Sequence, residues 1–125
     1  MTSSRQQLGR RAEDLVAQRL QAAGWELLAR NARTRYGELD IVARDGRTLV
    51  FVEVKAGRAG ARLGPERPIL AIDARKQRRL RQLATAWIAA NRGRGAYAAI
   101  RFDAVGVSFD RAGRAVEIEH IEAAF

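Results

Sequence analysis

GELDIVARDGRTLVFVEVK, from Gly37 to Lys55, contains two apolar and β-branched runs on either side of Asp45-Gly46. An Asp-Gly pair between such runs is one of the strongest short-range signals for a β-hairpin. With these two residues in the loop, Arg44 is expected to pair with Arg47, and a four-residue loop from Arg44 to Arg47 gives the same register. The stretch therefore predicts a hairpin around which the fold is organised.

Side chains alternate between the two faces of a strand, so this register sorts the hairpin into an apolar face and a charged face. The apolar face is expected to be core and holds Leu39, Ile41, Ala43, Val50, Val52 and Val54. The second face holds Glu38, Asp40, Val42, Leu49, Phe51, Glu53 and Lys55, with its charges gathered at one end. A solvated outer face is the simpler interpretation of such charges. The continuous apolar run from Val50 to Val54 is instead typical of a central strand covered on both sides.

Asp40 and Glu53 are the candidate metal ligands on the charged face. The register places Asp40 opposite Phe51, and hence diagonal to Glu53, with Cβ atoms about 7 Å apart or somewhat less. Two carboxylates at this separation can hold one hard cation such as Mg²⁺ or Mn²⁺, whereas without a cation they repel each other. Glu38, opposite Glu53 in the same register, is a candidate supporting acid, and Lys55 lies two residues further along the same face.

Size and composition indicate one soluble domain spanning residues 1–125. The chain has 125 residues and no cysteine, which excludes disulfides and a zinc centre built from thiolates. No apolar stretch approaches the roughly 20 residues of a membrane span, and the N-terminus lacks the apolar core of a secretory signal. We therefore expect a cytoplasmic protein.

The net charge of +9 is concentrated in one block of the chain. Residues 58–94 carry ten basic and two acidic side chains, a net charge of +8. General arginine enrichment, with 21 arginines and two lysines, explains part of the excess but not its segregation. A polyanion-binding surface does explain it. We expect nucleic acid, most readily DNA, as the partner, contacted by Arg58, Arg62, Arg67, Arg75, Arg78 and Arg79.

The periodicity of the rest of the chain predicts an α/β fold with a single mixed five-stranded sheet flanked by helices. The expected elements are a helix over 5–23, a strand over 25–31, the two arms of the hairpin, an irregular loop over 56–68, a helix over 74–90, and strands over 97–107 and 115–121. Asp73 is expected to cap the second helix and Gly24 to end the first. The first three strands form an antiparallel meander, and the second helix is the crossover to the fourth strand.

Two further charged side chains are expected to approach the carboxylates. Lys76 falls inside the apolar stripe of the second helix, one turn before Leu80, so it should point toward the sheet unless it snorkels at the helix start. Glu13 lies at the edge of the apolar stripe of the first helix, and either faces water or reaches over the rim of the sheet toward Asp40. Lys55 and Lys76 are the two lysines of the chain. An ammonium group can shift its pKa and handle protons, which an arginine fork does poorly, so both lysines at one site favour chemistry there.

The remaining unusual residues have simpler structural interpretations. His120 is the single histidine, in the last expected strand, and is expected to be structural. Arg101 and Asp103 are expected either to form a local ion pair or to line the edge of the sheet. Trp25 and Trp87 are expected to belong to the core.

The pattern of acids and lysine resembles a known signature. Asp40, a spacer of twelve residues and the triplet EVK ending at Lys55 are similar to the D…(D/E)XK pattern of the restriction-endonuclease-like PD-(D/E)XK nuclease superfamily, whose core has the same element order. Almost the whole chain resembles the YraN-like family of uncharacterised bacterial proteins. The segments that carry this resemblance are Gly9 to Leu20 (GRRAEDLVAQRL), Arg30 to Ala43 (RNARTRYGELDIVA), Leu49 to Lys55 (LVFVEVK) and Arg101 to Val107 (RFDAVGV).

The superfamily resemblance implies a Mg²⁺- or Mn²⁺-dependent endonuclease that hydrolyses phosphodiester bonds of DNA. In that scheme Asp40, Glu53 and the backbone carbonyl of Val54 are metal ligands, and Lys55 positions or activates the attacking water. Resolvase-like relatives imply branched or structured DNA as the substrate and suggest a homodimer.

The same resemblance implies supporting roles for two more side chains. Glu13 is similar to an extra acid of Holliday-junction-resolvase-like proteins, and Lys76 falls where several relatives carry a basic residue or glutamine. The chain departs from the signature at Leu39, where a proline usually precedes the aspartate. The YraN-like family has no assigned activity, so the alternative is a non-catalytic nucleic-acid-binding module that retains the nuclease fold. An assembly protein whose basic block meets an acidic partner is a third hypothesis.

Overall fold

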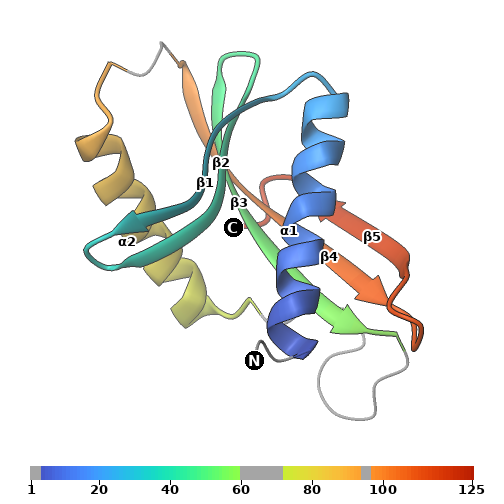
Figure 1. Cartoon of the computed structure of the whole chain (residues 1–125). Helices are drawn as coiled ribbons and strands as arrows, with labels where there is room; N and C mark the ends of the chain where they lie inside the picture. The colour runs from blue at the N-terminus through green and yellow to red at the C-terminus, as the bar shows by residue number, and fades with distance from the viewer. Residues whose placement is uncertain (1–3, 60–71, 94–96) are drawn as a thin grey trace.

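A computed structural model describes residues 4–59, 72–93 and 97–125 of the chain. Figure 1 shows its elements in chain order: α1 (Ser4–Ala22), β1 (Glu26–Thr34), β2 (Gly37–Asp45), β3 (Thr48–Arg58), α2 (Ala74–Ala90), β4 (Ala99–Phe109) and β5 (Ala115–Ile121). The five strands form one mixed sheet in the order β1-β2-β3-β4-β5. The predicted fold class, α/β with a single mixed five-stranded sheet flanked by helices, is therefore confirmed.

The predicted connectivity is also confirmed. β1, β2 and β3 form an antiparallel meander, and α2 carries the chain across to β4, which pairs in parallel with β3 from Thr48↔Ala99 to Arg58↔Phe109. Asp73 caps α2 because its Oδ1 accepts a hydrogen bond from the backbone N–H of Lys76 at 2.9 Å. Neither helix is long and apolar enough to cross a membrane.

The boundaries of several elements differ from the prediction by a few residues. β1 extends to Thr34 instead of ending at residue 31, and β4 runs over Ala99–Phe109. β3 continues to Arg58, so residues 56–58 belong to the strand and not to the predicted loop. The remainder of that loop, including Arg62 and Arg67, lies outside the described residues. Gly24 ends the first helix region with a φ of 91°, as predicted for a left-handed closing residue.

The predicted register of the central hairpin is wrong by two residues. Asp45 pairs with Thr48, which leaves Gly46 and Arg47 as the loop. Gly46 has a φ of 60°, and glycine at the first loop position is what a type II′ turn requires. Because the error is an even number of residues, it leaves most side chains on their predicted faces.

The correction changes the neighbours of the candidate ligand Asp40. β2 and β3 are paired from Asp45↔Thr48 to Ile41↔Val52, so Asp40 comes level with Glu53 and is neither opposite Phe51 nor diagonal to Glu53. Glu38 is accordingly not opposite Glu53.

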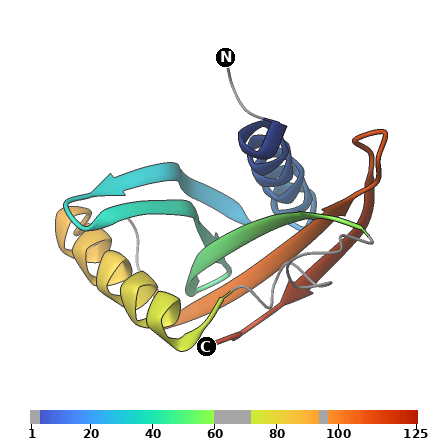
Figure 2. The same cartoon turned by 90° about the horizontal axis from the view of Figure 1, so that it is seen from below.

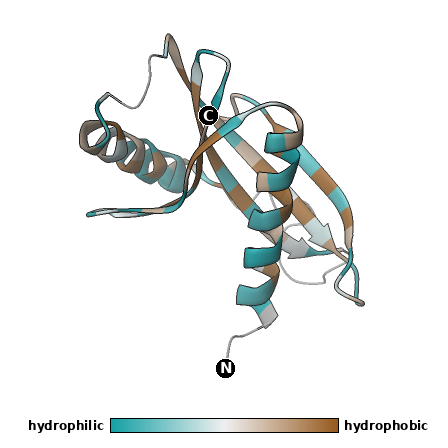
Figure 3. Ribbon diagram, turned by 45° about the horizontal axis from the view of Figure 1, so that its top comes forward, coloured by the Kyte–Doolittle hydropathy of each residue, from teal (hydrophilic) through white to brown (hydrophobic). Residues whose placement is uncertain are grey.

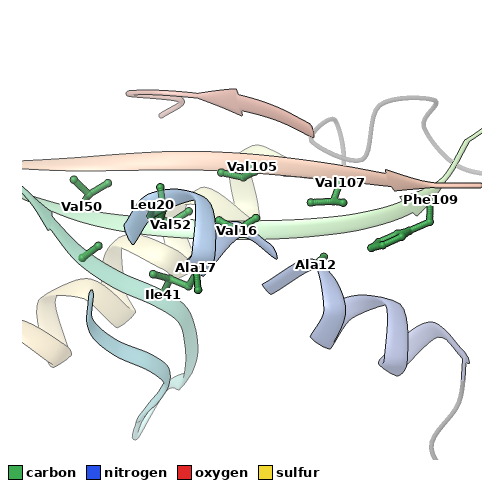
Figure 4. Close-up of a cluster of buried hydrophobic side chains, with 11 residues drawn as sticks. Ala12, Val16, Ala17, Leu20, Ile41, Val50, Val52, Val105, Val107 and Phe109 are labelled. Carbon is green, nitrogen blue, oxygen red and sulfur yellow. The ribbon is translucent and has the colours of Figure 1, made fainter. Parts of the chain in front are cut away.

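Two hydrophobic clusters cover the two faces of the sheet. On the α1 side, Ala12, Val16, Ala17 and Leu20 pack against Ile41, Ala43, Val50, Val52, Val105, Val107 and Phe109, as Figure 4 shows. On the α2 side, Leu80, Leu83, Ala84 and Trp87 pack against Leu39, Val42, Leu49, Phe51 and Phe102. The central strand β3 is thus buried on both sides, as its apolar run predicted. Figure 3 shows the same distribution, with hydrophobic residues recurring along the central strands.

Leu39 was predicted to lie on the apolar face with Ile41 and Ala43, but it lies on the α2 face of the sheet. It packs with Val42 under α2, although the alternation of side chains would place it with Ile41. Figure 2 shows that the β1–β2 hairpin curves away from the plane of β3 and lies beside α2. This curvature brings the start of β2, with Glu38 and Asp40, toward the first turns of α2.

Candidate metal centre

A cleft of about 430 Å³ opens between the β2–β3 pair and the N-terminal half of α2. Its lining consists of Glu38, Asp40, Glu53, Asp73, Arg75, Lys76, Arg79, Leu80 and Leu83. The sheet contributes the carboxylates Glu38, Asp40 and Glu53, and the helix contributes the cations. An acidic wall therefore faces a basic wall across the cleft.

Asp40 and Glu53 are adjacent at the bottom of the acidic wall. The Oδ2 atom of Asp40 accepts a hydrogen bond from the backbone N–H of Val54 at 2.8 Å, so the aspartate side chain bridges to β3 just beyond the last β2–β3 pair. Glu53 is 8% exposed, and its carboxyl group is close enough for its charge to act on Asp40. Burial, followed by the charge of Glu53, raises the pKa of Asp40 to about 8. Two negative charges this close in a buried site favour either a shared proton or a bound cation.

Both lysines of the chain converge on Glu53. The Nζ atom of Lys76 lies 3.1 Å from Oε1 of Glu53, and the Nζ atom of Lys55 lies 3.7 Å from the same oxygen. The prediction that Lys76 points toward the sheet is therefore confirmed. Burial, with the neighbouring Lys76 ammonium, lowers the pKa of Lys55. Contact with Lys55 and the charge of Glu53 outweigh burial and raise the pKa of Lys76. Lys55 therefore loses its proton to become a neutral amine more readily than Lys76 does.

Glu13 and Glu38 are linked by a residue that the sequence did not single out. With its amide nitrogen turned toward the two acids, Asn31 donates hydrogen bonds to Oε1 of Glu13 at 2.7 Å and to Oε1 of Glu38 at 3.0 Å. Asn31 lies in β1 between the pairs Arg30↔Ile41 and Ala32↔Leu39, and hence across from Asp40. Asn31 has a φ of 49°, which asparagine tolerates better than most residues. This preference of asparagine was the one feature of the sequence that could have pointed to Asn31.

Of the two positions predicted for Glu13, facing water or reaching over the rim of the sheet, the structure shows the second, because Glu13 contacts Asn31 of β1. Burial, followed by the charges of nearby acids such as Glu38, raises the pKa of Glu13, while Arg30 opposes the shift. In the described part of the chain, no trio of ligand atoms from Glu13, Asp40 and Glu53 lies mutually within 4.8 Å. Glu13 therefore does not complete a three-residue ligand set with Asp40 and Glu53 in this structure.

A second polar cluster lies at the β4–β5 edge of the sheet. Asp103, which is completely buried, accepts hydrogen bonds from Nε of Arg101 at 2.8 Å and from the backbone N–H of Ala123 at 3.0 Å. The Nε2 atom of His120 lies 2.8 Å from Oδ2 of Asp103. Of the two alternatives predicted for Arg101 and Asp103, the structure shows the ion pair, and His120 has a structural partner. Hydrogen bonds from His120 and Arg101 outweigh burial and hold the pKa of Asp103 below its ordinary value.

This second cluster could also hold a metal ion. Among the described residues, Asp103, His120 and Glu122 form the one trio of histidine and acidic side chains whose ligand atoms all lie within 4.8 Å of one another. The guanidinium of Arg101 sits on the same carboxylate, however, and a positive charge there disfavours a cation. Two ammonium groups likewise contact Glu53, but the two sites differ in the state of their aspartates. The pKa of Asp103 is held below its ordinary value by its partners, whereas burial and the charge of Glu53 leave the pKa of Asp40 raised, so the Asp40 carboxyl still lacks a compensating charge.

Of the arginines predicted to bind nucleic acid, the four that the structure describes fall on one helix and one strand end. Arg75, Arg78 and Arg79 are exposed on α2, with Arg75 and Arg79 lining the cleft, and Arg58 is exposed at the end of β3. The structure thus brings Asp40, Glu53, Lys55 and Lys76 together, with the α2 arginines beside them.

The fold and the cleft define the class of the protein as a single-sheet α/β protein with a pair of adjacent acids, Asp40 half-buried and Glu53 buried, facing a basic helix. The chain belongs to the uncharacterised protein family UPF0102, whose family model matches residues 12–107. A UPF0102 protein of Acidothermus cellulolyticus is 47% identical, covering 98% of this chain and 96% of its own length. A UPF0102 protein of Nocardia farcinica is 45% identical over 97% of this chain, and one of Geobacter metallireducens is 42% identical over all of it.

Proposed function

We propose that this protein is a Mg²⁺- or Mn²⁺-dependent endonuclease that hydrolyses phosphodiester bonds of nucleic acid, with DNA as the principal substrate. The observation that carries the proposal is the adjacent pair of half-buried Asp40 and buried Glu53, in a cleft whose opposite wall is basic. Hydrolysis of a phosphodiester needs a cation site, a means of holding water and positive charge for the phosphates. The cleft offers residues suited to each.

The donor set fits a hard divalent cation. Mg²⁺ takes oxygen ligands, is typically held by one or two carboxylates, and keeps several waters. Asp40 and Glu53 would supply the carboxylates, and the backbone carbonyl of Val54 is the further ligand that the superfamily resemblance implies. Their mutual repulsion gives the protein a physical reason to bind a cation there. A cation in this position supplies a Lewis acid that polarises a phosphoryl oxygen.

The lysines have separable roles in this scheme. Lys76 lies closer to Glu53 and fixes the orientation of that carboxylate through its 3.1 Å contact. Lys55 has the lowered pKa, so it is the better candidate for holding and deprotonating an attacking water. The arginines of α2 would neutralise the phosphates that flank the scissile bond.

A second candidate function is nucleic-acid binding without cleavage. The observation that favours it is α2 itself, whose sequence ARKQRRLRQLATAWIAA has five basic residues and no acid. This surface does not depend on Asp40 or Glu53. A binding module would show affinity that falls steeply with salt, but no turnover.

The proposal is tested with purified protein and labelled blunt duplex, flap, four-way junction and single-stranded DNA, with matched RNA strands, in Mg²⁺, Mn²⁺ or EDTA. We expect metal-dependent cleavage that falls at least about 100-fold in Asp40→Asn, Glu53→Gln and Lys55→Met. Glu117→Gln, on the exposed side of β5, is the matched control and should cleave like the wild type.

The outcomes separate the two candidate functions. Cleavage that persists unchanged in Asp40→Asn would assign the activity to a contaminant or to another site. Absence of cleavage on every substrate, together with salt-dependent binding, would leave the binding module. Absence of both would overturn the two candidates together.

A further inference from the structure

The tip of the β1–β2 hairpin lies against α2, next to the cleft. Figures 1 and 2 both show the turn between β1 and β2 beside this helix. The turn is held by Thr34, whose Oγ1 accepts a hydrogen bond from the backbone N–H of Tyr36 at 3.1 Å and donates one to the carbonyl of Gly37 at 3.0 Å. The tip therefore has a defined conformation of its own.

Contact with α2 fixes the position of this tip. Nη2 of Arg79 donates a hydrogen bond to the carbonyl of Tyr36 at 3.4 Å. At Gly37, with a φ of 142°, an added Cβ would lie 3.1 Å from Nη2 of Arg79 and 3.4 Å from Cδ2 of Leu83. The backbone thus approaches the helix as closely as only glycine allows. The backbone of Tyr36 is thus held by Thr34 and Arg79, and these contacts do not involve its ring.

The ring of Tyr36 is presented to solvent among arginines. The residue is 43% exposed, although tyrosine rings bury large areas when they serve the core. The guanidinium of Arg35 lies over the ring, with Cζ 4.9 Å from the centroid, and Nη2 of Arg35 donates to the phenol oxygen at 2.7 Å. Beside it is a hollow of about 730 Å³, lined among others by Arg35, Tyr36, Arg78, Arg81, Gln82 and Thr85.

The charge around this hollow is unbalanced. In the described part of the chain, neither Arg35 nor Arg78 forms an ion pair with a carboxylate. The described residues that line the hollow include no acid. An exposed aromatic ring between unneutralised guanidiniums is the combination by which proteins hold single-stranded nucleic acid, with the ring stacking on a base and the arginines contacting phosphates.

We propose that Tyr36 is a stacking platform for an unpaired base, and that Arg35 and Arg78 hold the phosphates on either side of it. This inference rests on the proposed function and names the substrate class more closely: a strand with unpaired nucleotides next to the cleft. Tyr36 lies in the turn immediately before β2, four residues from Asp40, which is about 13 Å of extended chain. At about 3.4 Å per stacked nucleotide, this spans about four nucleotides. Arg79 lines the cleft and its neighbour Arg78 lines the hollow, so one strand can follow both.

The test measures binding without cleavage, in EDTA, so that it does not depend on catalysis. The probes are a fluorescein-labelled oligothymidylate of about 12 nucleotides, within the site sizes of single-strand binders, and a blunt hairpin duplex of equal charge. The variants are Tyr36→Ala, Tyr36→Phe and Arg78→Ala. The control is Tyr97→Ala, because Tyr97 is 39% exposed but lies beside Asn91 and Gly93 at the far end of α2.

We expect Tyr36→Ala to weaken oligothymidylate binding by about 5- to 100-fold. Tyr36→Phe, which keeps the ring, and Tyr97→Ala should bind like the wild type. Duplex binding should change far less in Tyr36→Ala than in Arg78→Ala. In Tyr36→Trp, the added indole fluorescence should be quenched by the oligonucleotide, which reports stacking directly.

Several results would overturn the inference. Wild-type affinity of Tyr36→Ala, with weakened binding by Arg78→Ala, would remove stacking while leaving nucleic-acid binding intact. An equal loss in Tyr36→Ala and Tyr36→Phe would assign the effect to the hydroxyl and not to the ring. Absence of binding by the wild type to every probe would remove this inference and the proposed nucleic-acid function together, whereas loss of cleavage alone leaves this inference standing.

Discussion

Replacing Asp40 by asparagine should stabilise the metal-free protein at alkaline pH. Burial and the charge of Glu53 raise the pKa of Asp40 from an ordinary value of 3.8 to about 8. Between about pH 4 and about pH 8 the folded protein therefore binds a proton at Asp40 that the unfolded chain has released, so stability falls as the pH rises. Asparagine does not titrate, and its side chain can still accept the hydrogen bond from the N–H of Val54 while donating to Glu53.

The size of this effect follows from the shift. One pKa unit corresponds to about 1.4 kcal/mol, so a rise of about four units sets a ceiling of about 6 kcal/mol. Water entry and side-chain rearrangement on ionisation reduce the observable amount, and we expect the advantage of Asp40→Asn over the wild type to grow by about 2–4 kcal/mol from pH 5 to pH 9.

Urea denaturation in EDTA, followed by far-UV circular dichroism at several pH values, measures this difference. Glu117→Gln, at an exposed position on β5, is the control and should run parallel to the wild type at every pH. An advantage of Asp40→Asn that is the same at pH 5 and pH 9 would refute the reasoning, because the carboxyl pair would then be neither buried nor in contact.

Three further predictions concern cation binding and stability. Mg²⁺ or Mn²⁺ at 100 times its dissociation constant should stabilise the wild type by about 2.7 kcal/mol and leave Glu53→Gln unchanged in thermal unfolding; stabilisation retained in the variant would place the cation elsewhere. Asp103→Ala should lower the unfolding free energy by about 3–5 kcal/mol, because a guanidinium and an imidazole lose their buried partner; a loss below about 1 kcal/mol would contradict this. Gly37→Ala should lower it by about 1–3 kcal/mol, since its φ is 142° and the new Cβ meets Arg79. Gly9→Ala, in open space on α1, should raise it by about 0.5–1 kcal/mol, and equal effects at both glycines would contradict the contact.

The fold was largely predictable because its signals are local and repeated. The apolar stripe of α2, the Asp73 cap and the run of β-branched residues in β3 each determine an element without reference to the rest of the chain. The direction of Lys76 followed from helical angle alone, and its 3.1 Å contact with Glu53 agrees with it. The two-residue error in the hairpin did not disturb the face that carries Asp40, because side-chain alternation has a period of two.

The parts that could not be predicted depend on tertiary geometry. The register was decided by where Gly46 sits in the turn, and Asp-Gly is compatible with more than one such placement. Leu39 lies on the α2 face of the sheet, where the β1–β2 hairpin curves away from the plane of β3, and no local pattern encodes this. Asn31 joins Glu13 to Glu38 across two elements, and Tyr36 gains its setting from a helix far along the chain. Sequence reasoning found the charged groups of the site but missed the neutral side chains around them.

Because both lysines of the chain contact Glu53, the reactivity of their amines depends on what is bound in the cleft. The other 21 basic side chains are arginines, which do not react with acylating reagents as amines do. Lys55, whose pKa is lowered by burial and by Lys76, is the more nucleophilic of the two side-chain amines. Acylation of Lys55 and Lys76 therefore reports the state of the cleft, and a cation or a nucleic-acid strand bound there would be recorded as protection of the two peptides that carry them.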